Sequence, residues 1–117
     1  MISELTSRQV YLACGSTDLR RGIDGLAVLV KECFQLDPFS TCLFVFCNRK
    51  KDKIKCLYWD VNGFWLLVRR LEQGKFDCPQ EQGDTVGVSY RQLRWLLDGL
   101  SISQNKAHKE ISYSTII

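Results

Sequence analysis

Histidine is nearly absent from this sequence, and the short motifs of common metal and redox sites are missing. The 117 residues include a single histidine, His108, which excludes a zinc enzyme with several histidine ligands and argues against a histidine-based catalytic triad. None of the six cysteines forms a C-x-x-C pair, so neither a zinc ribbon nor a thioredoxin motif is present. We therefore expect no metal and no cofactor, and we expect reduced, mostly buried thiols.

Long apolar runs are missing as well. No stretch approaches the roughly 18–20 apolar residues that span a bilayer. The first ten residues contain Glu4 and Arg8 instead of the apolar segment of a signal peptide. These features predict a cytoplasmic protein that has no membrane partner.

The sequence offers little from which an active site could be built. GSTDLRRG holds two glycines but lacks the Gly-Lys-Ser/Thr ending of a phosphate-binding loop. Asp18, Asp24 and Asp60 are the obvious carboxylates for a magnesium site, but they are better explained as a helix cap, a first-turn helix acid and a turn residue. We therefore expect no catalytic residue and no enzymatic activity.

Positive charge is concentrated in one short segment. The whole chain has a net charge of +3, whereas the segment RKKDKIK at 49–55 alone carries five cations and one carboxylate. The rest of the chain is therefore slightly acidic. Two smaller basic groups are Arg69, Arg70 and Lys75, and the pair Arg20 and Arg21.

Hydrophobic periodicity predicts alternating strands and helices. A β-prone run at about 9–14 precedes apolar residues at steps of three and four, which predict a helix at about 19–35 capped by Thr17 or Asp18. The runs CLFVFC (42–47) and IKCLYW (54–59) predict two strands, the first buried on both faces, and the basic segment between them predicts a hairpin loop. Residues 75–78 and 86–88 predict two short strands, and Ser89 is the expected cap of a last helix.

Residues 62–73 are compatible with a helix or with a strand. FWLLVRRL could form a strand, but Phe64, Leu67, Val68 and Leu71 have the spacing of one helix face, and Gly74 suits the position after a helix end. We favour the helix.

The predicted fold class is then α+β, in the order β-α-β-β-α-β-β-α. The first six elements match the split βαβ pattern of ferredoxin-like folds, with an antiparallel or mixed sheet and helices packed on one face. We expect a single domain at 1–100 and a polar tail at 101–117 that is flexible or docks on a partner.

Three blocks of the sequence together resemble a known family. They are VYLACGSTDLRRGIDGLAVLV, LFVFCNRKKDKIKCLYWDVNGFWLLVRRLEQGKF and SYRQLRWLLDGL, which span about Val10 to Leu100. These blocks are similar to the accessory Orf2 (TnpB-type) proteins of the insertion-sequence 66 family of transposable elements. The resemblance implies a small non-catalytic protein that supports a separate transposase during DNA transposition, and it supplies no catalytic residue.

The first functional hypothesis is DNA binding through the basic hairpin. A loop with several cations can displace the counterions condensed on DNA phosphates, and arginine can contact phosphates or guanine edges through two hydrogen bonds. The DNA could be the ends of the element or any duplex. The expected contacts are Arg49, Lys50, Lys51, Lys53, Lys55, Arg69, Arg70 and Lys75.

The alternative hypothesis is a protein-interaction or oligomerisation module that assembles the transposition complex without touching DNA. Large aromatic side chains often anchor interfaces, and Trp59 and Trp65 cannot easily face the same interior as their neighbours Tyr58 and Phe64. The expected interface residues are Trp59, Trp65, Ile116 and Ile117. The partners would be the element's transposase or further copies of the chain.

Overall fold

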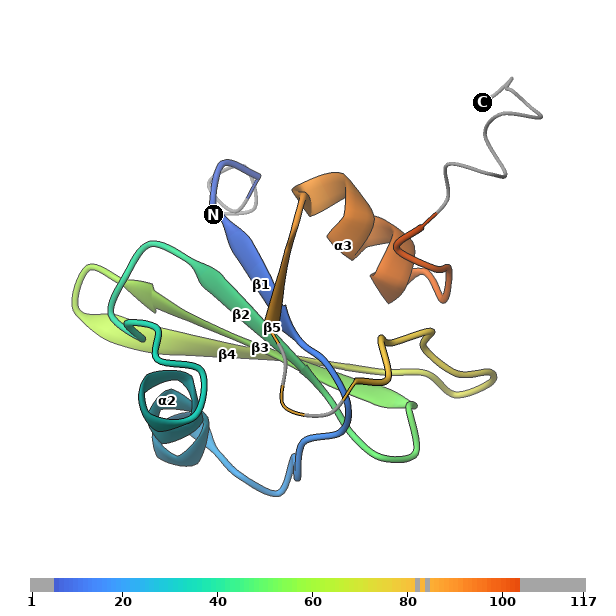
Figure 1. The fold of residues 1–117 in the computed structure, drawn as a ribbon, viewed down its shortest axis with the longest axis horizontal. Coiled ribbons are helices and arrows are strands. Elements are labelled where there is room, and N and C mark those ends of the chain that lie inside the picture. The colour runs from blue at the N-terminus through green and yellow to red at the C-terminus, as the bar shows by residue number, and fades with distance from the viewer. Residues whose placement is uncertain (1–5, 82, 84, 104–117) are drawn as a thin grey trace.

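The computed structural model describes residues 6–81, 83 and 85–103. Their elements are β1 (Val10–Ala13), α2 (Ile23–Glu32), β2 (Leu43–Cys47), β3 (Lys53–Asp60), β4 (Gly63–Arg70), β5 (Thr85–Val88) and α3 (Tyr90–Leu97). The strands form one mixed sheet in the order β4-β3-β2-β1-β5 (Figure 1). β1 pairs with β2 in parallel, and every other neighbouring pair is antiparallel. The predicted α+β class is confirmed.

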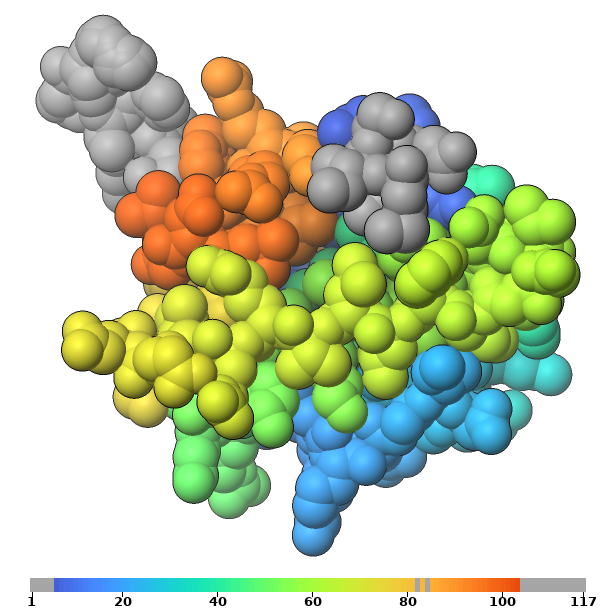
Figure 2. Space-filling view, turned by 180° about the vertical axis from the view of Figure 1, so that it is seen from behind, coloured from blue at the N-terminus to red at the C-terminus, as the bar shows by residue number. Residues whose placement is uncertain are grey.

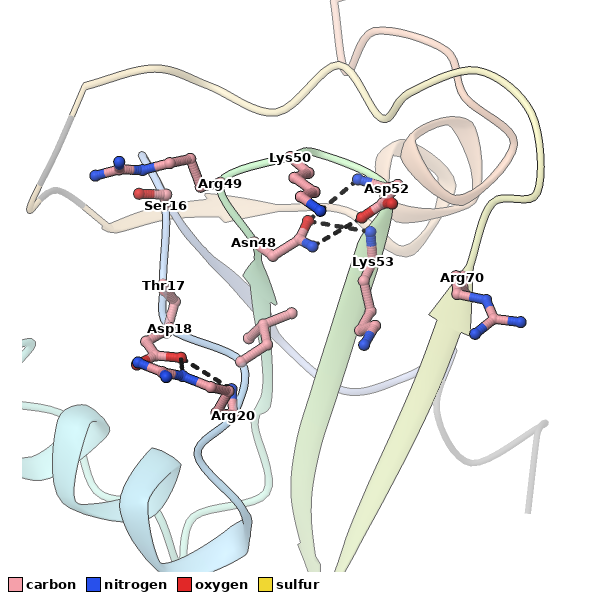
Figure 3. Close-up of a pocket in the computed structure, with 11 residues that line it drawn as sticks. Ser16, Thr17, Asp18, Arg20, Asn48, Arg49, Lys50, Asp52, Lys53 and Arg70 are labelled. Carbon is pink, nitrogen blue, oxygen red and sulfur yellow. Dashed lines mark hydrogen bonds and ion pairs between the residues drawn. The ribbon is translucent and has the colours of Figure 1, made fainter.

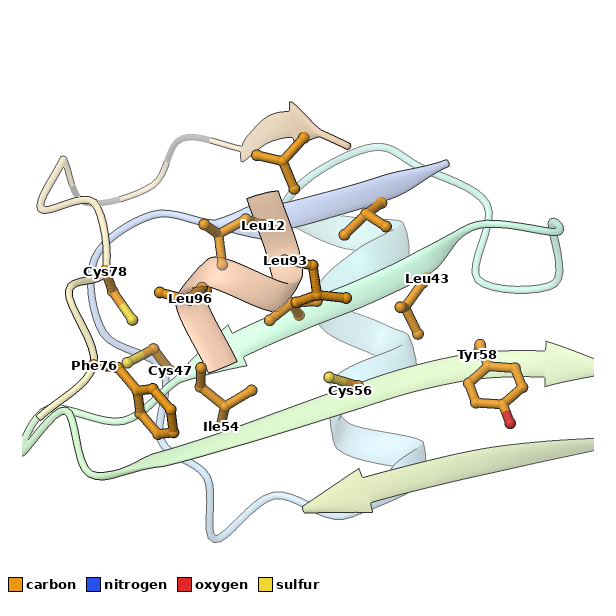
Figure 4. Packing of buried hydrophobic residues seen from close by; sticks show 13 residues of the cluster. Leu12, Leu43, Cys47, Ile54, Cys56, Tyr58, Phe76, Cys78, Leu93 and Leu96 are labelled. Atoms are coloured by element: carbon orange, nitrogen blue, oxygen red, sulfur yellow. The ribbon is translucent and has the colours of Figure 1, made fainter. Parts of the chain in front are cut away.

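The two helices cover opposite faces of the sheet (Figure 1). Leu26 and Val30 of α2 pack on one face against Phe44, Phe46 and Leu57. Figure 4 shows the other face, where α3 packs on a second cluster. That cluster contains Val10, Leu12, Leu43, Val45, Cys47, Ile54, Cys56, Tyr58, Phe76, Cys78, Val88, Leu93 and Leu96. The prediction of helices on one face is therefore wrong, because β2 and β3 carry apolar side chains on both faces and each face needs cover.

β2 and β3 form as predicted. All five residues of β2 are buried, and it pairs antiparallel with β3 across the basic turn. Ile54, Cys56 and Tyr58 lie in the α3-side cluster, whereas Leu57 lies in the α2-side cluster. Ser89 also caps α3 as predicted, since its side chain accepts a hydrogen bond from the Gln92 backbone N–H while the Gln92 side chain accepts one from the Ser89 N–H.

The predicted helix at 62–73 is wrong, because Gly63 to Arg70 form strand β4. β4 pairs with β3 along its whole length, from Asp60 opposite Gly63 to Lys53 opposite Arg70. A helix here would leave the outer edge of the buried strand β3 without backbone partners. The free-energy penalty of those unpaired N–H and C=O groups is larger than the gain from a favourable helical spacing. The observed order is β-α-β-β-β-β-α, so the split βαβ pattern is not formed.

Three smaller predictions also need correction. Residues 75–78 are not a strand, although Phe76 and Cys78 are buried in the α3-side cluster. The helix expected at 19–35 begins at Ile23, and Gly22 precedes it as the N-cap. Asp18 instead accepts a hydrogen bond from the backbone N–H of Arg20 in the loop before the helix.

Neither α2 nor α3 has the length and apolarity that crossing a membrane requires. The tail predicted at 101–117 lies largely outside the described part of the chain, since residues 104–117 are not described.

The tip of the β3–β4 hairpin holds a strained residue. Val61 has φ of 55° and is 87% exposed, and the Asn62 N–H donates to the Asp60 carbonyl at 2.5 Å. A β-branched residue rarely adopts this left-handed conformation, whereas asparagine tolerates it.

We expect Val61→Asn to raise the free energy of unfolding by about 1 kcal/mol, because it relieves this strain without removing buried surface. Thermal unfolding should show a rise in Tm of about 4–8 °C. The control is Val28→Asn on α2, a site that is 55% exposed, where valine and asparagine have similar helix propensity. An equal shift in both variants would contradict the explanation.

Candidate nucleic-acid interface

A pocket of about 750 Å³ lies at the edge of the sheet where the parallel strands β1 and β2 end. The loops that follow the two strands form its walls, and the Thr17 N–H donates to the Cys47 carbonyl at 2.8 Å between them. In sheets with parallel strands, the carboxyl ends are the usual place for ligands. The lining residues are Ser16, Thr17, Asp18, Leu19, Arg20, Asn48, Arg49, Lys50, Asp52, Lys53 and Arg70 (Figure 3). We call this site the basic pocket, because five of these side chains are cationic and two are acidic.

Asn48 holds the basic turn between β2 and β3 in one conformation. Its side-chain oxygen accepts hydrogen bonds from the N–H groups of Asp52 and Lys53, both at 3.1 Å. Its amide nitrogen donates to Asp52 Oδ1 at 2.8 Å (Figure 3). This hydrogen bond lowers the pKa of Asp52 below its ordinary value, and the positive charges of Lys75 and Lys50 add to the effect. The turn is therefore a fixed platform for its cations.

The chain that follows β4 supports the same turn from behind. The Leu71 N–H donates to the Asp52 carbonyl at 2.8 Å, and the Phe76 N–H donates to the Lys51 carbonyl at 2.7 Å. Lys75 Nζ donates to the Lys50 carbonyl at 2.9 Å. Since Phe76 is only 1% exposed, it anchors this support in the core.

Three cations of the basic pocket are available to a ligand. In the described part of the chain, the side chains of Arg49, Lys50 and Lys53 have no ion-pair partner. Lys53 and Arg70 lie opposite each other in the β3–β4 register, so their side chains share one face of the sheet. Arg70 also forms an exposed ion pair, in which its Nε donates to Glu72 Oε2 at 3.0 Å, and such exposed pairs are weak enough for a ligand anion to compete.

Arg20 lines the basic pocket and forms an exposed ion pair there with Asp18. Its Nε and Nη2 donate to the two oxygens of Asp18 at 3.0 and 2.8 Å. The hydrogen bonds from Arg20 hold the pKa of Asp18 far below its usual range. Since the Arg20 side chain is 91% exposed, its guanidinium keeps donors free for a second anion.

The structure brings together only part of the basic set predicted from sequence. Arg49, Lys50, Lys53 and Arg70 line the basic pocket, whereas Lys51, Lys55, Arg69 and Lys75 do not. Lys55 donates to the Arg21 carbonyl at 3.1 Å. Arg69 lies on the α3 side and donates to the Leu97 carbonyl at the end of that helix, where a cation is favourable.

Arg20 is the lining cation that sequence reasoning did not assign to the site. It stands out in sequence only as half of a small basic pair. Its place in the site depends on the parallel pairing of β1 with β2, which sequence reasoning did not anticipate.

The predicted aromatic interface residues differ in environment. Trp59 is half-buried and packs edge-on against Phe39 and Phe64, with ring centroids 5.0 Å apart in both cases. Trp65 is 45% exposed, and its indole N–H donates to Asp60 Oδ2 at 3.1 Å. Ile116 and Ile117 lie outside the described residues.

The carboxylates considered for a magnesium site are spread over separate elements. Asp18 binds Arg20, Asp24 lies in the first turn of α2, and Asp60 accepts from Trp65. Within residues 6–81, 83 and 85–103, no group of three or more His, Cys, Asp or Glu side chains is placed to hold a metal ion.

Comparison with known proteins connects this fold with a family. A family model described as IS66 Orf2 like protein matches residues 8–107. The chain belongs to this family. The match confirms the resemblance seen in the sequence, and it places the chain among accessory proteins of insertion sequences, a class distinct from catalytic transposases.

Two relatives in Sinorhizobium fredii share this similarity. The uncharacterized protein y4hO is 37% identical over 92 residues, which cover 79% of this chain and 80% of that protein. The uncharacterized protein y4jC is 32% identical over 106 residues, which cover 91% of both chains. No solved structure matches the chain.

We expect Asn48→Ala to loosen the basic turn. Loss of the two backbone hydrogen bonds to the Asn48 side chain should lower the free energy of unfolding by about 1–2 kcal/mol. The pKa of Asp52 should rise toward its ordinary value, because its main hydrogen bond is removed.

Urea unfolding and an NMR titration of the Asp52 carboxyl test the two effects. The folded pKa of Asp52 is depressed, so its stabilising contribution is present above the unfolded pKa and is lost as the pH falls through the folded pKa. The stability difference between wild type and Asn48→Ala should therefore shrink below about pH 4. An unchanged Asp52 pKa in the variant would contradict the assignment.

Proposed function

We propose that this accessory protein binds duplex DNA, with the basic pocket contacting the phosphate backbone during transposition. The observation that carries the proposal is the group of five cations held at one edge of the sheet. Family membership supplies the context of an insertion sequence.

The geometry favours a polyanion over a small anion. The cations come from three separate segments, since Arg20 precedes α2, Arg49, Lys50 and Lys53 lie on the turn and at the start of β3, and Arg70 ends β4. A row of phosphates offers a separate anion to each segment. Each contact to B-DNA releases condensed counterions, which makes the binding dependent on salt.

The rigidity of the turn increases the gain from each contact. The backbone of residues 48–53 is fixed by Asn48 and by the following chain, so binding does not have to order this segment. Only side-chain freedom is lost, and that costs less than ordering a flexible loop.

The test compares Arg49→Glu/Lys50→Glu with wild type in fluorescence-anisotropy titrations over a salt series. We expect the affinity for duplex DNA to fall about tenfold or more, and the slope of log K against log salt to decrease by about 2. The matched control is Lys31→Glu/Arg91→Glu, which makes the same charge change at exposed sites on α2 and α3. Binding that is independent of salt, or equal losses in both double variants, would reject the proposal.

Two duplexes should be used, one with the ends of the element and one with a scrambled sequence. Tighter binding to the true ends would show recognition of those ends. Equal binding to both would show that the contacts go to the phosphate backbone alone.

A further inference from the structure

β4 is a long strand at the edge of the sheet with its outer side open. It has eight residues, and no described strand pairs with its outer edge. Figure 2 shows β4 as a yellow-green band across the face of the molecule. The opposite edge strand, β5, has only four residues and includes Gly87, so it offers a much shorter edge.

The register shows which backbone groups of β4 face outward. A two-residue loop joins Asp60 and Gly63, which pair with each other, so the N–H and C=O groups of Gly63, Trp65, Leu67 and Arg69 bond to β3. Those of Phe64, Leu66 and Val68 point away from the sheet. Stable monomers usually protect such an edge with a lysine, a proline or a bulge, and residues 64–68 (FWLLV) contain none of these residues.

The side chains along this edge are apolar and exposed. Val68 is 56% exposed, Trp65 45% and Leu67 36%. Arg69 and Arg70 follow this uncharged stretch at one end of β4, whereas the other end, Gly63 and Phe64, is uncharged. Positive charge therefore lies at one end of the edge only.

We propose that β4 pairs antiparallel with β4 of a second copy of this chain, so that two five-stranded sheets join into one. Leu66 is the centre of the uncharged stretch, and pairing about it places Phe64 opposite Val68 and Trp65 opposite Leu67 of the second copy. Aromatic side chains opposite branched aliphatic ones are favourable cross-strand pairs. The outward groups then form about six main-chain hydrogen bonds between the chains.

Charge favours a second copy in this orientation. With Leu66 at the centre, antiparallel pairing places Arg69 and Arg70 of each copy opposite the uncharged Gly63 and Asn62 of the other, so the arginines of the two copies lie apart. A parallel arrangement would place Arg69 and Arg70 beside the same residues of the partner copy, and like charges there are destabilising. The charges are thus compatible with self-pairing in one direction only.

The first test is the mass of the full chain in solution without DNA, measured by analytical ultracentrifugation at micromolar concentrations. We expect wild type at twice the mass of one chain and Val68→Lys at the mass of one chain. The matched control is Val28→Lys on α2, where the valine is 55% exposed compared with 56% at Val68. This control should remain dimeric.

A second variant and a second readout make the test independent of the added charge. Val68→Pro removes an N–H that faces outward, so it blocks pairing with another chain and leaves the bonds to β3 in place. Amide hydrogen exchange should be at least about tenfold faster at Phe64 and Leu66 in the Val68 variants than in wild type. Exchange at Trp65 and Leu67 should stay slow in all of them, which also shows that the variants fold.

The proposal is overturned by a monomeric wild type, by a Val68→Lys variant as dimeric as Val28→Lys, or by a wild-type dimer in which Phe64 and Leu66 exchange rapidly. None of these measurements includes DNA. Failure of self-pairing is therefore distinguishable from failure of the proposed DNA binding.

Discussion

The parallel pairing of β1 with β2 is the constraint on which the rest of the structure depends. Parallel neighbours cannot be joined by a tight turn, so the chain must cross back through α2, and the helix covers one face of the sheet. The pairing also brings the carboxyl ends of β1 and β2 to the same edge. The loop with Arg20 and the turn with Arg49 and Lys50 meet there for that reason.

Signals within a few residues of sequence were enough to predict some of the elements. The buried strand β2, the basic turn after it and the Ser89 cap of α3 follow from apolar runs, charge and capping chemistry. The formation of β4 depends on another strand, because the backbone groups on the outer edge of β3 need hydrogen-bond partners. One local signal was available. Asn62-Gly63 between two apolar runs is typical of a hairpin turn. It marks the position of the turn to within one residue, since the two loop residues are Val61 and Asn62.

The residues of the candidate site could be predicted only where the secondary structure was predicted correctly. In a strand, neighbouring side chains point to opposite faces, so Arg69 binds the end of α3 while Arg70 lines the basic pocket. A helix at 62–73 would have kept both arginines in one basic group. Charge density therefore located the turn at 49–53, but the pairing of strands decided which cations share a surface.

β4 contributes to both proposed surfaces, and its geometry relates them. A two-fold axis between two antiparallel β4 strands is perpendicular to the sheet, so the α2 faces of both copies lie on the same side. Each basic pocket adjoins the Arg70 end of β4 on that face. With Leu66 at the axis, the two Arg70 positions are about 27 Å apart along the strands. The turns with Arg49 and Lys50 lie farther from the axis, because two strand positions separate β4 from β2. In the proposed dimer, the two pockets would then be separated on the scale of the roughly 34 Å that lies between half-sites one turn apart on B-DNA.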